Sequence, residues 1–548
     1  MLRIIDLHNH PSMKPYNNDT YRDDVDLWDG MEADAENYYR LNGLIRGVIT
    51  ETARDSQAQM REWVKGDLSL CICALHPTER GWFVRSTEKK GRIRKWLLGL
   101  LLREDDIASL GAALTGFPIA KVRKVIKRVR CNQGIDYFTE PAFGEYSYLR
   151  LRQGTAGPWG FTYKIVNNYD EYQHVRAVGN QLAMIISVEG GHSLTTISKG
   201  SWFNTPYDRL PRDDKEVFKA SLQSNIRHLK GTGPDAALNF EHTPFFVTLV
   251  HMYNNLLAGH AKSYSAGHGI VPGMDDLLYQ AVGLDDGITD AGWLAINQLL
   301  DRSLGRRVLI DVKHLSMRAR QEYYEFVADK RDAGDAIPVI ASHAAVNGHE
   351  TNDVNRKDTY RSDKSTYLSC WSINLSNEDI RAIHASDGII GLVVHEGRTP
   401  GGKTKKNLKK LKKCIAKGGK QAFHAQEELA ALYCQLILSN IFQIVLAVGN
   451  RSAWDIIALG SDYDGIMDLF NCYPKVGDFH QLIEDIGGFL KAPQFLKLYK
   501  NDKLTTFGPP QLKDMMYGLS PADIMQKIAH QNAEIFLSKY FTDEYLSA

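Results

Sequence analysis

Short apolar runs rich in β-branched residues alternate along this chain with longer stretches of helical period. Runs that are apolar on both faces are typical of parallel strands that helices cover on both sides. Their alternation with helical stretches predicts repeated βα units and a parallel sheet. The candidate strands are Leu2–Leu7, Leu44–Thr50, Leu68–Leu75, Met184–Val188, Phe245–Val250, Arg307–Val312, Pro338–Ala341, Gly388–Val394 and Ile456–Gly460.

A closed barrel of eight strands accounts for all but one of these nine runs. We therefore predict the α/β class, with a TIM-like (β/α)8 barrel that carries helical and loop insertions. One of the two runs between residues 44 and 75 is then an extra strand or a helix. A length of 548 residues alone suggests about three domains, but such barrels tolerate long insertions. We expect residues 1–548 to form a single barrel domain.

Two basic stretches have the character of insertions, at residues 84–135 and 400–420. The first contains KKGRIRKWLLGLLLRED and IAKVRKVIKRVR, and the second contains PGGKTKKNLKKLKKCIAKGG. A Lys-rich amphipathic helix suits an anionic partner or a membrane surface. It equally suits a solvated helix that packs Leu408, Leu411 and Ile415 inward, which is the interpretation that we favour.

Composition narrows the class of partner. The formal net charge is +1, which gives no reason to expect nucleic acid. We find no apolar run near the ~20 residues of a membrane span, Trp96–Leu102 being the best candidate, and no signal peptide at the start. Seven scattered cysteines without a CxxC pair indicate a reducing compartment. We expect a cytoplasmic protein with a small-molecule substrate, no membrane span and a homodimer as its candidate assembly.

Polar residues that can do chemistry follow the predicted strands. His8 and His10 come after RIIDL, and residues two apart in a strand share a face at a spacing of ~7 Å. Five further residues close or follow later runs: Glu189, His251, His314, His343 and Asp462. Active sites of barrel enzymes lie at the carboxyl ends of the strands. We therefore predict that these side chains meet in one site.

Imidazole and carboxylate ligands together suit Zn²⁺ and similar ions. Glu189 is the natural carboxylate to bridge two ions, with His8, His10, His314 and His343 as the other ligands. Two ions ~3.5–4 Å apart hold a hydroxide nucleophile between them and polarise a carbonyl oxygen. Asp462 is suited to accept the proton of the attacking water, and His251 to stabilise the oxyanion. The expected cofactors are two divalent metal ions, with Zn²⁺ as the expected element.

The motifs IDLHNH, SVEGGHS, TLVH, DVKHLS, ASHAA and GSDYDG resemble those of the membrane (renal) dipeptidase family of the amidohydrolase superfamily. They occur in the family's order from residue 2 to about residue 465, and HQNAEIFL resembles the family's closing helix. EGGHS and GSDYDG are the most specific of them. The resemblance implies a binuclear zinc hydrolase of dipeptides. It implies His8 as the first ligand, Glu189 as the bridge, His314 and His343 at the second ion, Asp462 as the catalytic aspartate and His251 as the histidine that contacts the substrate carbonyl.

The chain departs from this family at two positions of the site. His10 stands where the family has aspartate, although a His-x-His pair is common in the wider superfamily. Ile373 precedes Asn374 in SINLSNED, where the family has an arginine for the substrate carboxylate. Arg356 and Arg361 are the candidates to replace it. These departures keep open a different substrate, such as another small amide, an N-acyl amino acid or a lactone.

Four polar residues next to the predicted site are expected to have structural or supporting roles. We expect His192 and Asp464 to fix the EGGHS and GSDYDG loops. Asp6 and Asp311 are candidates to orient the ligand histidines, or to make capping and core hydrogen bonds. A binding protein that kept the barrel without catalysis would have lost metal ligands or Asp462, and the chain retains them.

Overall fold

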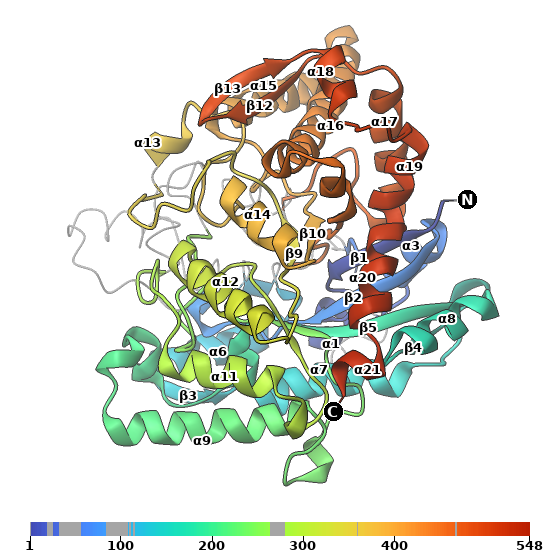
Figure 1. The fold of residues 1–548 in the computed structure, drawn as a ribbon. Coiled ribbons are helices and arrows are strands. Elements are labelled where there is room, and N and C mark those ends of the chain that lie inside the picture. Colours follow the sequence, from blue (N-terminus) through green and yellow to red (C-terminus); the bar gives the residue numbers. More distant parts are fainter. Residues whose placement is uncertain are drawn as a thin grey trace.

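Eight parallel strands close into a barrel in the computed structural model (Figure 1). The structure describes residues 2–18, 26–31, 56–83, 108, 111–112, 115–263, 280–358, 360–465 and 468–547. The ring closes because β2 pairs with β1 on one side and with β5 on the other. The barrel strands, in order around the ring, are β1 (Ile4–Asn9), β2 (Leu68–Leu75), β5 (Gln181–Glu189), β7 (Phe246–Thr248), β8 (Leu309–Asp311), β9 (Ile340–Ala344), β10 (Ile389–Leu392) and β11 (Ile457–Leu459).

The predicted barrel is thereby confirmed, and eight of the nine predicted runs form its strands. Leu68–Leu75 is β2, with the predicted bounds. Leu44–Thr50 lies outside the described residues. One strand of the large sheet was not predicted: β4 (Thr162–Ile165) pairs with the first residues of β5, on the edge where β7 pairs with the last ones. Its four residues are too short to give a clear apolar run.

Helices surround the barrel, and two small antiparallel pairs lie outside it (Figure 1). The pairs are β3 (Gln133–Asp136) with β6 (Thr196–Lys199) and β12 (Leu496–Lys500) with β13 (Lys503–Phe507). The helices are α1 (Met13–Asn18), α3 (Met60–Lys65), α6 (Ile119–Arg130), α7 (Phe143–Arg152), α8 (Tyr169–Val178), α9 (Arg212–Leu229), α11 (Asp290–Leu300), α12 (Met317–Asp332), α13 (Tyr360–Asp363), α14 (Asn377–Ala385), α15 (Gly402–Lys417), α16 (Lys420–Val448), α17 (Phe479–Lys491), α18 (Pro509–Asp514), α19 (Pro521–Gln526), α20 (Asn532–Tyr540) and α21 (Asp543–Leu546).

Local sequence sets the boundaries of several helices. Ser316 caps α12 by accepting the N–H of Ala319, and Ser376 and Asp379 form a capping box at the start of α14. α16 ends at Gly449, whose φ of 76° favours glycine. At the end of the chain, α20 lies beside β1, where Arg3 pairs with Glu534 at 3.0 Å. A residue next to β1 and a residue of α20, far apart in the sequence, are thus in contact.

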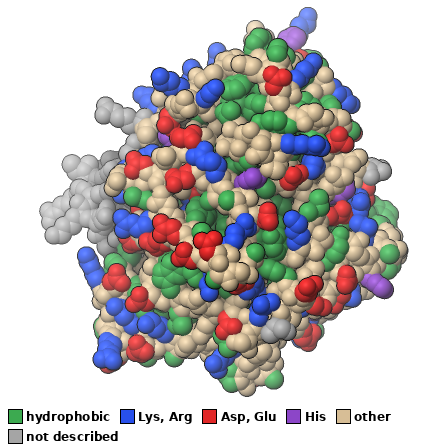
Figure 2. All heavy atoms as spheres, viewed as in Figure 1, with side chains coloured by type: hydrophobic (Ala, Val, Ile, Leu, Met, Phe, Trp, Pro, Cys, Tyr) green, Lys and Arg blue, Asp and Glu red, His purple; other side chains and the backbone are tan. Residues whose placement is uncertain are grey.

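The basic stretches form helices where the structure describes them. Most of residues 84–114 lie outside the described residues, and the following part forms α6 with Val122 and Ile126 buried. In α15, Leu408 is fully buried, and Leu411 and Ile415 pack partly buried against the core. This is the arrangement expected of a solvated helix with its leucines inward. Figure 2 shows basic and acidic side chains interspersed on one face, in keeping with the near-neutral net charge.

The expectation that no apolar run approaches membrane-spanning length was wrong for α16. Among the described residues, this 29-residue helix is long and apolar enough to cross a membrane by length and composition. Of its most apolar window, 61% is buried inside the fold, and the helix packs beside α14, α15 and β12. Burial of this extent is typical of a core helix, in which few positions need to be polar.

Candidate metal centre

The Glu189 carboxylate lies at the centre of a buried group of histidines at the carboxyl ends of the barrel strands. Six histidines of the described residues have a ring nitrogen within 3.2 to 3.7 Å of a Glu189 carboxylate oxygen: His8, His10, His76, His251, His314 and His343. Asp462 Oδ1 lies 3.5 Å from His10 Nε2 and 4.0 Å from His8 Nε2. All seven residues predicted for the site are therefore brought together.

The side chains reach this centre from the carboxyl ends of several strands. His8 lies in β1 and His10 directly follows it, with ring centroids 4.9 Å apart. His314 and Asp462 follow β8 and β11 with φ values of 68° and 61°, in the left-handed region that non-glycine residues rarely adopt. Such backbone costs on the order of 1–3 kcal/mol per residue and clusters at functional sites. The surrounding fold holds these two side chains at the centre against that cost.

One set of three atoms has the dimensions of a zinc site. His314 Nε2 and His343 Nε2 are 3.2 Å apart, and each lies 3.4 Å from Glu189 Oε1. Ligand atoms around a tetrahedral ion with bonds of ~2.0–2.1 Å are about 3.3 Å apart. These three atoms therefore fit a single ion of this size with little movement.

His8 and His10 have the hydrogen bonding of metal ligands. The Nδ1 of His8 lies 3.2 Å from Ser342 Oγ, and the Nδ1 of His10 lies 2.9 Å from the Ala74 carbonyl oxygen. The Nε2 of each is buried and has no hydrogen-bond partner among the described residues. A ligand histidine uses one ring nitrogen for such a contact and leaves the other for the metal. With Glu189 and Asp462 adjacent, these two histidines fit a second ion.

Asp6 and Asp311 support the centre without touching a histidine ring by hydrogen bond. Asp311 Oδ2 accepts from Ser342 Oγ at 2.6 Å, and this hydroxyl lies 2.9 Å from His343 Nδ1. Asp6 accepts from the backbone N–H of His8 and from Ser461 Oγ, at 3.3 and 2.6 Å. Of the two roles left open for these residues, both carboxylates make core hydrogen bonds, and the Ser342 hydroxyl lies between Asp311 and the His343 ring.

His192 and Asp464 hold loops. His192 Nε2 lies 2.7 Å from the Pro77 carbonyl oxygen, and a Cβ at Gly190 would lie 2.3 Å from His192 Nδ1. Gly190 also has a φ of 94°, so the EGGHS turn requires glycine there. Asp464 accepts from Lys14 Nζ at 2.6 Å and from two backbone N–H groups at 2.9 Å.

Two residues at the site were missed by the sequence analysis, His76 and Glu79. His76 directly follows β2, so the rule that identified the other histidines applied to it as well. Glu79 Oε2 lies 2.6 Å from His251 Nδ1, and its carboxylate accepts the backbone N–H groups of Met252 and Tyr253. Glu79 therefore fixes the orientation of the His251 ring, with Nε2 on the side of Glu189.

Burial and neighbouring charges set the protonation of the centre. Burial holds the pKa of His314 and His343 well below the usual value, and lowers those of His76 and His251 to about 3 and about 4. Neutral imidazoles of this kind are the form that binds metal. Burial alone would raise the pKa of Glu189, but His251 and His10 outweigh it and hold that pKa well below the usual value. Glu189 is therefore an ionised carboxylate.

The pKa values of His10 and Asp462 are both raised, for different reasons. Burial lowers the pKa of His10, but Glu189 and Asp462 outweigh it and raise the pKa to about 10. Burial raises the pKa of Asp462. A cation bound between these groups would displace the His10 proton, since metal binding and proton release are linked.

Cationic side chains lie near one side of the centre. Lys313 is 3% exposed, and its Nζ has no hydrogen-bond partner among the described residues. Burial and the charge of Arg398 lower its pKa to about 7. Arg398 also contributes to lowering the pKa of His251, and its carbonyl oxygen accepts from Asn374 Nδ2 at 2.8 Å. The side chain of Arg361 is outside the description, and Arg356 Nη2 contacts Met317 Sδ at 3.4 Å.

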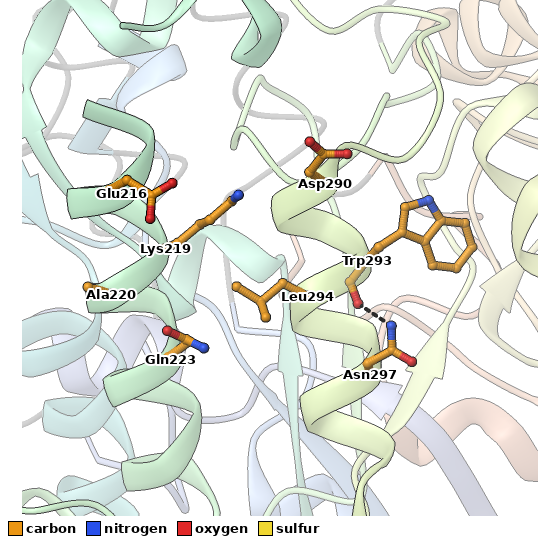
Figure 3. Close-up of a pocket in the computed structure, with 8 residues that line it drawn as sticks. All are labelled: Glu216, Lys219, Ala220, Gln223, Asp290, Trp293, Leu294 and Asn297. Carbon is orange, nitrogen blue, oxygen red and sulfur yellow. Dashed lines mark hydrogen bonds between the residues drawn. The ribbon is translucent and has the colours of Figure 1, made fainter. Parts of the chain in front are cut away.

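A separate groove on the outer helices has no part in this centre. It lies between α9 and α11, with a volume of about 480 Å³ (Figure 3). Lys219 and Gln223 of α9 lie opposite Leu294 of α11 (Figure 3). Asn297 also lines the groove, and its Nδ2 donates to the Trp293 carbonyl oxygen at 2.8 Å. None of its lining residues belongs to the histidine and carboxylate group.

Comparison with known proteins gives structural neighbours and no relative by sequence. No family model and no curated protein matches the chain. One similar solved structure is described as the dipeptidase AC, a metallopeptidase of family M19, at 12% identity over 98% of this chain and 99% of that one, with a TM-score of 0.46. The probable dipeptidase PvdM from Pseudomonas aeruginosa matches at 14% identity over 89% of both chains, with a TM-score of 0.45.

A third neighbour is a metallopeptidase from Rhodobacter sphaeroides liganded with a phosphinate mimic of the dipeptide L-Ala-D-Ala. Its identity is 12% over 98% of this chain and 99% of that chain, with a TM-score of 0.45. At such low identities and TM-scores, the barrel rests on the strand pairing, and the chemistry rests on the residues of the centre.

Proposed function

We propose that this chain is a metal-dependent hydrolase that cleaves the amide bond of dipeptides with two divalent ions, most suitably Zn²⁺. The observation that carries the proposal is the triangle of His314 Nε2, His343 Nε2 and Glu189 Oε1, with sides of 3.2, 3.4 and 3.4 Å. These separations match a tetrahedral zinc site. The second position is supported by the unpartnered Nε2 atoms of His8 and His10 beside the same carboxylate.

Bound divalent ions supply an activated water and polarise the scissile carbonyl. Asp462 lies at the edge of the ligand group, where its carboxylate can take the proton of the attacking water and deliver it to the leaving amine. A raised pKa, caused by burial, suits a carboxylate that must hold this proton for part of the cycle. We therefore give Asp462 the role of general base and acid.

We assign to His251 the stabilisation of the developing oxyanion. Its Nδ1 is engaged by Glu79 at 2.6 Å, which leaves Nε2 on the side of the metal ligands, 3.7 Å from Glu189 Oε1. A donor held rigidly in a buried site stabilises charge that forms in the transition state more than charge in the substrate. Glu79 is the positioning residue for this histidine.

Two cationic side chains favour a dipeptide over other small amides as the substrate. A dipeptide carries a carboxylate near its scissile bond. Arg398 brings positive charge to His251, and Lys313 brings it to His314 and His343, since each contributes to lowering the pKa of those histidines. A buried ammonium without a protein partner is stabilised by an anionic group of the substrate. A neutral lactone or cyclic amide would leave it unpaired.

The second candidate is an amidohydrolase that acts on another small amide, an N-acyl amino acid or a lactone. His10 in place of aspartate and Ile373 in place of arginine favour it, because both alter the resemblance to the dipeptidase family. An N-acyl amino acid keeps the carboxylate that Lys313 and Arg398 would bind. The two candidates therefore differ in whether the substrate needs a free amino group.

The test is a substrate panel with protein that carries two ions per chain. We expect turnover of L,L or L,D dipeptides, and a strongly reduced kcat/KM for the same dipeptides with an amidated C-terminus. Turnover of N-acyl amino acids or lactones without dipeptide turnover would favour the second candidate. Fully loaded protein that turns over no compound of the panel would contradict both.

A further inference from the structure

His76, Glu189 and His251 form a second group of potential metal ligands beside the binuclear centre. β2 and β7 lie on either side of β5, so His76 and His251 approach Glu189 from neighbouring strands. One ligand atom from each residue lies within 4.8 Å of the others, and all three side chains are buried. The His76 and His251 rings are 4.5 Å apart between centroids.

Both histidines have one ring nitrogen engaged and the other available. His76 Nδ1 lies 3.2 Å from the carbonyl oxygen of Glu189, to which it can donate, and the same nitrogen lies 3.4 Å from Glu189 Oε2, so a cation on this side either takes Nδ1 from the carbonyl or requires the ring to turn. The Nε2 of His76 is buried and has no hydrogen-bond partner among the described residues. In His251, the Nδ1 is held by Glu79 at 2.6 Å. A backbone carbonyl or carboxylate behind the ring is the usual support of a metal-binding histidine.

We propose that His76, His251 and Glu189 bind a third divalent cation, which occupies this position when metal is in excess and inhibits the hydrolase. Three protein ligands leave one coordination position open, as in many zinc sites. Separations of up to 4.8 Å exceed the ~3.3 Å edge of a tetrahedral site, so the side chains must move inward to bind the ion. The third cation therefore binds more weakly than the pair.

Inhibition follows from the use of His251 at this position. A cation on His251 Nε2 takes the ring nitrogen that the proposed function assigns to the oxyanion. This part of the inference rests on the proposed function. Binding of the third cation does not, because it depends only on the ligand atoms.

The experiment is equilibrium dialysis of the full chain against increasing Zn²⁺, with bound zinc measured per chain. We expect two tight equivalents and a third at higher concentration, with inhibition in parallel with the third. His76→Gln should weaken the third equivalent at least ~10-fold and relieve the inhibition. The matched control is His192→Gln, since His192 is equally buried and lies near His76 but is not in the ligand group. It should keep the third equivalent.

Zinc-edge diffraction from wild-type crystals soaked in excess Zn²⁺ gives an independent result if a variant fails to fold. A peak in contact with His76 and His251 is expected. Saturation at two ions, a third equivalent that survives His76→Gln in folded protein, or no peak at these residues would overturn the proposal. Wild-type protein that shows the third equivalent but hydrolyses no substrate would contradict the proposed function and leave the cation site standing.

Discussion

His314 Nε2 and His343 Nε2 lie 3.2 Å apart, although the two residues come from separate barrel strands. Burial keeps the pKa of both rings well below the usual value, so both are neutral in the folded protein. The Glu189 carboxylate is 3.4 Å from each. Three electron-rich atoms this close in a buried site are best stabilised by a shared cation.

Removing one ligand of this triangle should empty one of the two proposed metal positions. We expect His343→Ala to bind one ion per chain instead of two and to lose activity by at least ~100-fold, because a bound ion is directly involved in the chemistry. Metal content by mass spectrometry and kcat/KM measure the two effects. The matched control is His384→Ala, a part-buried histidine that contacts Ser452 instead of the centre. Two ions in His343→Ala would contradict the assignment.

The role of Asp462 as proton acceptor can be distinguished from that of a metal ligand by comparing catalysis with metal content. Asp462→Asn keeps the size of the side chain but removes the proton acceptor, so turnover should fall about 10²- to 10⁴-fold while two ions remain bound. Parallel measurements of kcat and metal content test this. If the variant loses an ion and keeps its activity per bound ion, Asp462 is a ligand and not the base.

A buried ion pair away from the centre stabilises the barrel. Arg320 on α12 is 1% exposed and contacts Asp379 of α14 through two bonds of 2.9 and 3.2 Å. Arg320→Met leaves the Asp379 charge buried without this partner and should lower the free energy of unfolding by about 3–5 kcal/mol. Arg318→Met, at an exposed position of the same helix, should change it by less than about 0.5 kcal/mol. Denaturant unfolding compares them, and equal effects would contradict the account.

Glu79 should make the stability of the metal-free protein depend on pH. Burial raises the pKa of Glu79 from 4.5 to about 7. The folded state thus holds the proton more tightly than the unfolded state, and the associated stability is present below pH 4.5 and lost as pH rises towards 7. The loss is on the order of 3 kcal/mol. Glu79→Gln should remove this part of the slope in unfolding measurements from pH 4.5 to 7, and an unchanged slope would refute the prediction.

The apolar pattern predicted the barrel because its strands are buried on both faces and are therefore continuously apolar. The seven candidate site residues could be selected from the sequence because barrel geometry places the carboxyl ends of all strands at one rim. His76 follows the same rule, but the family motifs do not include it, and the choice between the two runs at residues 44–75 was open. Glu79 lies three residues further along a loop, and its contact with His251 depends on tertiary structure that the sequence pattern does not contain.

The environment of helix α16 could not be predicted from its sequence pattern. Its apolar positions face several partners at once, so it lacks the one-sided periodicity of a surface helix. Only its neighbours in the fold distinguish such a core helix from a membrane-spanning one. The burial of 61% of its most apolar window favours a core helix, and composition does not contain this information.

The most direct test of the central claim is diffraction at the zinc absorption edge from crystals grown with two equivalents of Zn²⁺ per chain. The account predicts two anomalous peaks ~3.5–4 Å apart, both in contact with Glu189, one beside His8 and His10 and the other beside His314 and His343. A single peak, or no peak within bonding distance of Glu189, would contradict it.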